Sequence, residues 1–181
     1  TRGVVRIGGV PISRLNENQL AAFRQKHIGF VFQSYNLLPE LTAAENVAMP
    51  LMFKGVDPDV RLLEAKKMLC RVGLKDRMDH FPNQMSGGQQ QRVGIARAFI
   101  TQPEVVFADE PTGNLDTRTT KEVMHMIRGF AHRFHQTIVL VSHDPEMTEY
   151  ADRIVTLIDG RIVSNVENQV KAEIDAAPYI E

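Results

Sequence analysis

Two short stretches, separated by one helical pattern, constrain this chain more than any other feature. The first, 84–92, is a polar, glycine-bearing loop that runs directly into the helical pattern of 93–100. Its backbone N–H groups should lie at a helix N-terminus, where unpaired donors and the helix dipole attract anions. The second, 105–111, is an apolar run that ends in Asp109 and Glu110. It predicts a buried parallel strand that delivers two carboxylates to the sheet edge where ligands of α/β proteins bind.

The adjacent acids carry chemical information of their own. A single carboxylate just past a strand is usually a helix cap. Two neighbouring carboxylates at a buried strand end repel each other, and they persist mainly where a cation is bound near them. We therefore expect a cation close to Asp109 and Glu110.

Five short motifs follow one another in the order found in the ATP-binding cassette (ABC) ATPases, and together they resemble that family. They are Phe32-Gln33, Ser86-Gly87-Gly88-Gln89, the strand 105–110, Gly113-Asn114-Leu115-Asp116 and Ser142-His143-Asp144. In family terms they look like the Q-loop, the signature loop, the Walker B strand, the D-loop and the switch-histidine loop. A lone Ser-Gly-Gly-Gln would mean little, because Gly and Ser pairs mark loops everywhere. The segments 31–39 and 113–116 resemble the branch that powers lipoprotein-release and macrolide-export transporters.

The resemblance implies an α/β fold of the P-loop NTPase type, with a mainly parallel core sheet, an inserted α-helical subdomain and an antiparallel β edge. Residues 1–181 would form a partial ABC ATPase domain. Its expected parts are a helical subdomain with the signature loop at about 34–100, the Walker B to switch-histidine core at 101–164 and a polar tail at 165–181. The Walker A motif Gly-x-x-x-x-Gly-Lys-[Ser/Thr], which holds the β- and γ-phosphates, is absent, and the chain begins with Thr. We expect an N-terminally truncated fragment.

The resemblance also implies the role of each residue at the strand ends. Asp109 would hold Mg2+, and Gln33 would reach the same ion and the attacking water. Glu110 would orient and polarise that water in line with the γ-phosphate of ATP, and His143 would contact this phosphate. Without the family, Gln33 would be a polar residue ending a strand and His143 an ordinary loop residue.

Two further groups of residues would face a second ABC ATPase protomer, in a homodimer or a heterodimer. The signature loop would bind the ATP held by that protomer through Ser86, Gly87, Gly88 and Gln89. Ser86 can donate its hydroxyl, the glycines let the backbone approach phosphate, and a helix beginning near Gln89 supplies the dipole. The D-loop would lie at the dimer interface with Asn114, Leu115 and Asp116. Asp116 is equally an N-cap for the helix 117–134, and the two roles are compatible.

The remaining patterns predict local structure. Expected helices cover 16–26, 42–48 with a Thr42/Glu45 capping box, 57–72 and 145–151; expected strands cover 28–32 and, as a second buried parallel strand, 137–141; hairpins are expected at 3–12 and 153–164. The helix 57–72 should bury Leu62, Leu63, Ala65, Met68 and Leu69. Cys70 should be a small buried apolar residue. Arg92 and Arg97 could serve phosphate, but we expect both to be solvated or structural charges.

The segment 34–55 carries more apolar side chains than a loop needs. In the family this region receives a coupling helix of a transmembrane permease subunit. Packing within the subdomain explains the same side chains, and both explanations stay open.

Composition narrows the partners. With 21 basic and 22 acidic residues, nothing steers the chain toward nucleic acid. A single cysteine excludes a disulfide within the chain, and the apolar runs are too short to span a bilayer. We expect a location on the cytoplasmic face of the membrane, reached through the permease.

The sequence thus predicts an ATP-hydrolysing subunit of an ABC transporter of the exporter or lipoprotein-release type, with ATP and Mg2+ as ligands. The fragment alone should not hydrolyse ATP, because it contains no Walker A motif. One alternative is a regulatory or scaffold module of a division or envelope complex. Another is a naturally short chain that lends its signature loop to a complete partner.

Overall fold

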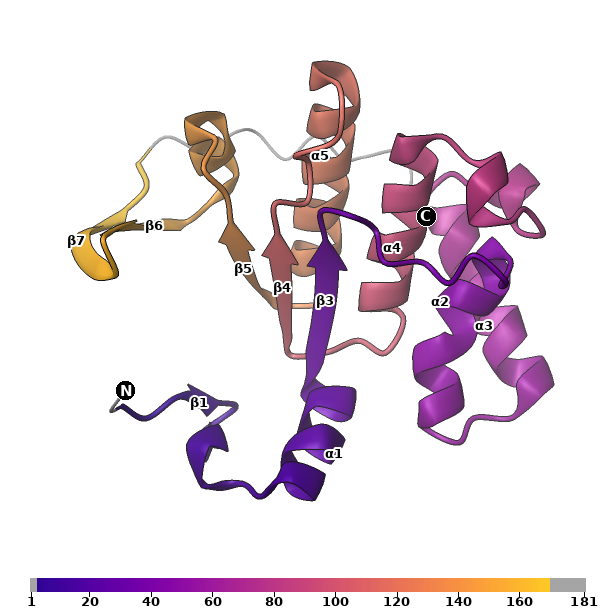
Figure 1. The fold of residues 1–181 in the computed structure, drawn as a ribbon, viewed down its shortest axis with the longest axis horizontal. Helices are drawn as coiled ribbons and strands as arrows, with labels where there is room; N and C mark the ends of the chain where they lie inside the picture. Colours follow the sequence, from indigo (N-terminus) through magenta and orange to yellow (C-terminus); the bar gives the residue numbers. More distant parts are fainter. Residues whose placement is uncertain (1–2, 170–181) are drawn as a thin grey trace.

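The computed structural model describes residues 3–169, and a three-stranded parallel sheet forms its centre (Figure 1). The strands are β3 (Ile28–Phe32), β4 (Val105–Asp109) and β5 (Thr137–Val141), arranged in the order β3-β4-β5. Each strand is a short run rich in β-branched and aromatic residues, which suit a pleated sheet. All three end level with one another, so the residues that follow them gather at one edge.

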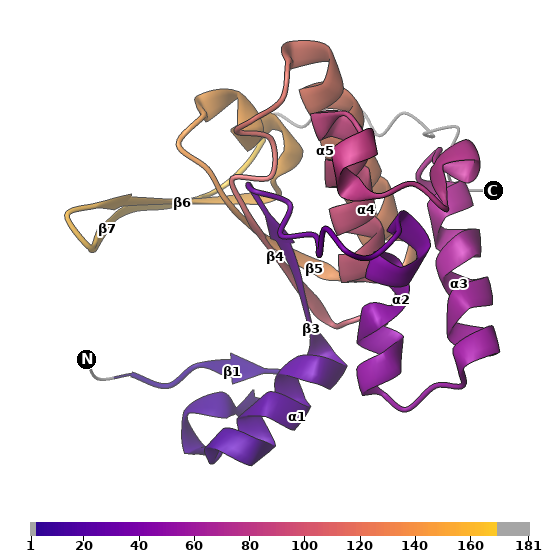
Figure 2. The ribbon, with the colours of Figure 1, turned by 45° about the vertical axis from the view of Figure 1, so that its right-hand side comes forward.

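Two helices cover one face of this sheet (Figure 2). They are α4 (Gly87–Phe99) and α5 (Thr117–Arg133), which pack against each other, with α4 also against β3. The stacked rings of Phe99 and Phe130, 5.1 Å apart, join the two helices in the core, and both side chains are fully buried. The helices are held by the usual apolar stripe at helical spacing.

Several side chains on the opposite face of the sheet are exposed, and this makes one prediction wrong. β5 was expected to be a buried strand, but Val139 and Val141 are 39% and 54% exposed, and Phe30 of β3 is 42% exposed. The covered face, by contrast, buries Val31 and Val106. A parallel strand is buried on both faces only when helices lie on both faces.

The helix pair α2 (Ala43–Phe53) and α3 (Pro58–Arg71) packs beside α4, and α2 departs from its prediction. The capping box is present: Thr42 Oγ1 accepts the Glu45 N–H at 3.2 Å, and Glu45 returns a carboxylate oxygen to the Thr42 N–H at 2.8 Å. The helix continues past Ala48 and through Pro50. It ends at Phe53, and Gly55, two residues further on, has a φ of +73° and donates its N–H to the Met52 carbonyl at 3.0 Å.

Helix α3 begins and ends where the sequence predicts, with Asp57 as its N-cap and Gly73 as its left-handed stop. Its buried face is centred on Ala65, Met68 and Leu69. Two burial predictions are wrong, because Leu63 is 54% exposed and Cys70 is exposed. These two residues are seven apart, so both lie on the opposite side of the helix from the buried stripe.

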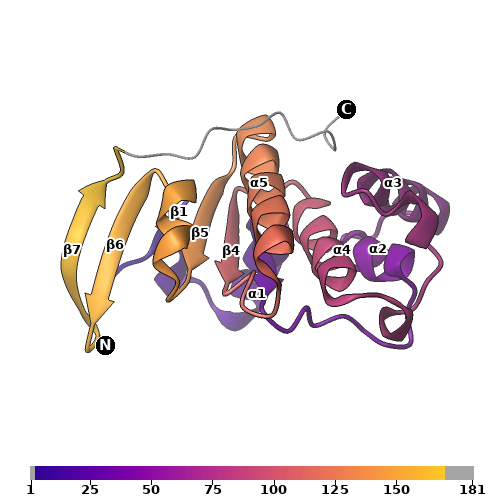
Figure 3. The same ribbon diagram turned by 90° about the horizontal axis from the view of Figure 1, so that it is seen from above.

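Antiparallel pairs complete the fold (Figure 3). β1 (Arg6–Ile7) and β2 (Val10–Pro11) precede helix α1 (Glu17–His27), and β6 (Arg153–Ile158) pairs with β7 (Arg161–Glu167). Viewed from above, the β6–β7 hairpin and the α2–α3 pair lie at opposite ends of the sheet. The short 3₁₀ helices are Ile12–Arg14, Lys75–Arg77, Pro82–Gln84 and Pro145–Tyr150.

The expected polar tail is wrong at its start, because 165–167 belong to β7 and are paired with β6. The hairpin turn at Asp159 and Gly160, with φ of +48° and +73°, places these residues in register with β6. The rest of the predicted tail, from 170 on, lies outside the described residues. Among 3–169, no helix combines the length and apolar character needed to cross a membrane.

Candidate functional site

The C-terminal edge of the sheet brings the predicted strand-end residues together. The last residues of the strands are paired in register, Phe32 with Asp109 and Asp109 with Val141. The residues that follow them directly are Gln33, Glu110 and the pair Ser142 and His143. A sheet edge of this kind is where α/β proteins bind ligands. Asp109 is exposed there, and its carboxylate is available to a ligand.

Glu110 is the best-anchored acid at this edge. Its backbone is left-handed, with φ of +44°, and its N–H donates to the Val141 carbonyl at 2.9 Å. One carboxylate oxygen accepts the backbone N–H of His143 at 2.9 Å and lies 2.6 Å from His143 Nδ1. The other accepts the Ser142 hydroxyl at 3.1 Å. The carboxylate therefore bridges the end of β4 and the loop after β5.

These contacts set the charges of the pair. Burial raises the pKa of Glu110, but hydrogen bonds from His143 and Ser142 outweigh it and leave the pKa below its ordinary value. The hydrogen bond and charge of Glu110 raise the pKa of His143 above 6.5. Glu110 is thus a carboxylate at neutral pH. An acid with a lowered pKa is a weak base, so it suits orienting and polarising a water more than removing its proton early.

The D-loop positions Gln33. The Asn114 side chain donates to the Gln33 carbonyl at 3.1 Å. A Cβ on Gly113 would lie 2.6 Å from Gln33 Nε2, so a larger residue there would displace that amide from its present position. Leu115 packs against the core, and Asp116 is the N-cap of α5, accepting the N–H groups of Arg118 and Thr119. The predicted capping role of Asp116 is confirmed; its interface role stays a prediction.

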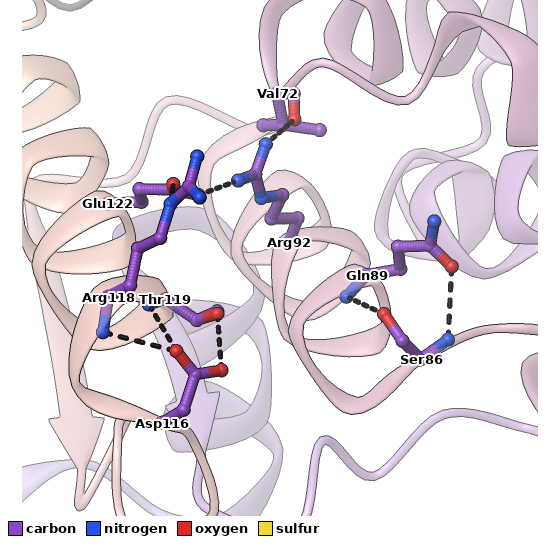
Figure 4. Close-up of polar contacts among 8 residues, drawn as sticks. All are labelled: Val72, Ser86, Gln89, Arg92, Asp116, Arg118, Thr119 and Glu122. Atoms are coloured by element: carbon purple, nitrogen blue, oxygen red, sulfur yellow. Dashed lines mark hydrogen bonds and ion pairs between the residues drawn. The ribbon is translucent and has the colours of Figure 1, made fainter.

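The signature loop ends in a capping box (Figure 4). Ser86 Oγ accepts the Gln89 N–H at 3.4 Å, and the Gln89 side chain accepts the Ser86 N–H at 3.0 Å. The helix was expected to begin near Gln89 but begins at Gly87, because Ser86 is the cap. The hydroxyl hydrogen of Ser86 is not used in this box and stays available to a phosphate oxygen.

Both signature glycines have a role within the chain that the sequence did not reveal. A Cβ on Gly87 would lie 2.7 Å from the Tyr35 hydroxyl, and one on Gly88 would lie 2.7 Å from Thr119 Cγ2. The glycines thus let α4 approach the segment after β3 and the first turn of α5. Close approach to phosphate was the expected reason; close packing inside the protomer is a second and independent one.

The residues present fit the expected ligands. Asp109 and Gln33 offer oxygen atoms at neighbouring strand ends, the ligand type that Mg2+ prefers. The described residues hold no cluster of three or more His, Cys, Asp or Glu side chains that could bind a metal alone. A sparse oxygen set suits Mg2+, which keeps waters and phosphate oxygens among its ligands. The amides of Gly87 and Gly88 precede the first helical hydrogen bond of α4, from Gln90 to Ser86, as in an anion site.

Of the two explanations expected for the arginines of α4, solvated or structural charges, the contacts support the structural one. Arg92 pairs with Glu122 of α5 at 2.5 Å and donates to the Val72 carbonyl at 3.3 Å (Figure 4). Arg97 donates to the carbonyls of Tyr35 and Asn36.

Sequence reasoning missed Ser142 as a partner of Glu110. A hydroxyl residue directly before the histidine was the available signal.

Comparison with known proteins defines the class. The sequence profile of the ABC transporter family matches residues 1–113, more than half of the chain. The chain belongs to the ABC transporter family, as an ATP-binding domain.

Its relatives include the proteins of the predicted branch. It is 51% identical over 162 residues to an uncharacterized ABC transporter ATP-binding protein of Thermotoga maritima, covering 90% of this chain and 69% of that one. It is 45% identical over 161 residues to the lipoprotein-releasing system ATP-binding protein LolD of Bacteroides fragilis, covering 89% and 74%. It is also 45% identical over 180 residues to the macrolide export ATP-binding/permease protein MacB of Salmonella typhimurium, covering 98% of this chain but 28% of MacB.

A solved structure confirms the fold class. The ATP-binding cassette MJ0796, in a dimeric post-hydrolysis state bound to ADP and Pi, superposes with a TM-score of 0.83 at 38% identity, covering 92% of this chain and 74% of that one. The predicted α/β ABC ATPase fold, with a parallel core and antiparallel strands, is therefore correct.

Proposed function

We propose that the protein containing this chain is the ATP-hydrolysing subunit of an ABC transporter of the exporter or lipoprotein-release type. The observation that carries the proposal is the Glu110 carboxylate, ionised and held by Ser142 and His143 at the sheet edge beside Asp109. A fixed anion beside a metal-binding carboxylate is what in-line attack of water on a phosphate requires.

Each strand-end residue has one role in this proposal. Asp109 and Gln33 hold Mg2+, which when bound neutralises charge on the phosphates. Glu110 orients and polarises the attacking water. His143 lies 86% exposed with its Nδ1 on Glu110, so its other ring nitrogen is free to face the γ-phosphate. Ser142 and the His143 N–H keep the Glu110 carboxylate turned toward the reaction.

The proposed site is completed by a second protomer. Ser86, Gly87, Gly88 and Gln89 present a helix N-terminus and a hydroxyl to ATP held by the other chain. The D-loop residues Asn114, Leu115 and Asp116 lie next to Gln33 and at the start of α5. Contact of these residues with the partner can therefore affect the C-terminal edge of the sheet. The dimeric state of the similar cassette MJ0796 supports this arrangement.

A transmembrane permease is the proposed second partner, and it places the chain at the cytoplasmic face of the membrane. Met52 and Phe53 are 45% and 62% exposed at the end of α2, and Leu38 is 43% exposed in the segment before its start. Phe53 lines a hollow of about 670 Å³, whose other walls include residues of α1, β3, α2 and α4. An apolar helix end of the permease fits such a hollow. The ATP-binding/permease name of MacB supports the pairing.

Magnesium-dependent ATP hydrolysis tests the proposal. We expect the intact protein to release phosphate, and these 181 residues alone to release none, because no Walker A motif lies among them. Hydrolysis by the 181 residues would refute the second expectation. Absence of hydrolysis by the intact protein, with the permease present, would refute the function and favour a scaffold.

A further inference from the structure

The two turns that carry Gln33 and Glu110 are held in an uncommon backbone conformation. Glu110 has φ of +44°, and the two residues that follow the Gln33 turn, Tyr35 and Asn36, have φ of +60° and +47°. None of these is glycine. Non-glycine residues adopt the left-handed region rarely, and they persist there only when their surroundings hold them.

Gln91 of α4 holds the turn that contains Glu110. Its side chain is fully buried, and its Nε2 donates to the carbonyl of Pro111, the residue directly after Glu110. Proline has no N–H, so its carbonyl is the one backbone group of Pro111 that a side chain can hold by a hydrogen bond. Gln91 Oε1 has no partner among the described residues. A buried amide with only part of its bonds made is costly, so its place in an apolar stripe calls for a reason.

Arg97 of the same helix holds the turn that follows Gln33. Nη1 donates to the Asn36 carbonyl at 2.6 Å and Nη2 to the Tyr35 carbonyl at 2.8 Å. Burial lowers the pKa of Arg97, but an arginine remains charged at neutral pH. One guanidinium therefore binds both left-handed residues, with the fork geometry that lysine lacks.

Gly94 shows that these contacts form one stripe along α4. It lies three residues from both Gln91 and Arg97, so the three positions follow one another along the helix surface. A Cβ at Gly94 would lie 3.7 Å from the Tyr35 carbonyl and 3.8 Å from Gln91 Oε1. Both turns thus contact the same helix, the one whose N-terminus is the signature loop.

We propose that Gln91 and Arg97 are positioning residues, which fix the Glu110 and Gln33 turns to the signature helix. This rests on the proposed function, in which Glu110 and Gln33 act on ATP. A shift of α4 on contact with the partner's nucleotide then moves both turns together. Nucleotide contact at the signature loop thus changes the sheet edge of its own protomer, as well as the ATP site of the partner.

Amide hydrogen exchange on the 181-residue chain tests the contacts without any need for activity. In Gln91→Met we expect the Gly113 amide, which donates to the Glu110 carbonyl, to exchange at least about tenfold faster, while the Tyr35 amide is unchanged. In Arg97→Lys we expect the reverse. Gln136→Met is the matched control, because the Gln136 amide also donates to a proline carbonyl, that of Pro103 at 2.7 Å, and its Oε1 also has no partner among the described residues, while both residues lie before the start of a strand.

Turnover by the intact protein tests the consequence. We expect Gln91→Met to lower kcat at least about tenfold with KM nearly unchanged, and Gln136→Met to leave both unchanged. A protected Gly113 amide and an unchanged kcat in Gln91→Met would overturn the proposal. If Gln91→Met does not fold, Arg97→Lys tests the proposal instead, and a Tyr35 amide that exchanges no faster than in the wild type would overturn it. If the wild-type protein hydrolyses no ATP, the proposed function fails, while the exchange result still decides whether α4 holds the turns.

Discussion

Replacing Gly88 by alanine tests whether the signature glycines serve packing inside the protomer. The new Cβ would lie 2.7 Å from Thr119 Cγ2, closer than real Cβ contacts allow. Thr119 cannot simply rotate away, because its hydroxyl donates to Asp116 at 2.7 Å. Overpacking of this kind costs about 1–3 kcal/mol, and the higher helix propensity of alanine returns at most about 1 kcal/mol. We expect Gly88→Ala to lower the free energy of unfolding by up to about 2 kcal/mol.

The second variant, Thr119→Ser, removes the methyl group and keeps the hydroxyl. On this background Gly88→Ala should no longer be destabilising, so the double-mutant cycle should give the overpacking cost alone, a coupling of about 1–3 kcal/mol. Urea unfolding of the four proteins, followed by circular dichroism, measures it, provided that the slope with urea stays constant. Additivity within about 0.5 kcal/mol would refute the packing explanation.

Three further predictions concern core burial, the α4–α5 ion pair and the Glu110–His143 contact. Phe99→Ala should lower the free energy of unfolding by about 3–5 kcal/mol and Leu63→Ala by less than about 0.5 kcal/mol, since Phe99 is fully buried and Leu63 is 54% exposed; equal urea midpoints would contradict this. Arg92→Met should cost about 1–2 kcal/mol and Arg118→Met almost nothing, because the side chains of these two partners of Glu122 are 14% and 90% exposed; similar losses in thermal melts would count against the α4–α5 ion pair. The ion pair between Glu110 and His143 should be complete at those pH values below 6.5 at which Glu110 is still ionised. It should be lost as pH rises through the raised pKa of His143, and lost as pH falls through the lowered pKa of Glu110. An NMR titration in which Glu110→Gln leaves the pKa of His143 unchanged would disprove it.

Local rules were enough to predict most of the fold. Caps and stops such as Asp57 and Gly73 act within one turn of the chain, so the sequence predicts the bounds of α3 almost to the residue. The strand-end residues were predicted because parallel strands deliver their C-terminal residues to one edge.

The failures concern what lies next to a residue in space. The exposure of Val141 depends on which elements cover the sheet, and that of Cys70 on which side of α3 faces α2 and α4. The neighbours of Gly88 and Gln91 come from residues 20 or more positions away. No pattern within a single window of sequence reports such contacts.

The central claim is that Glu110 of one protomer and Ser86 of the other serve the same ATP. Turnover by mixed dimers of the intact protein tests it directly, using Glu110→Gln and Ser86→Arg. Each variant alone should be inactive. Mixing should restore one intact site in half of the dimers, about a quarter of wild-type turnover. A mixture that remains as inactive as its two components would contradict the claim, because it would place both residues at the site of a single chain.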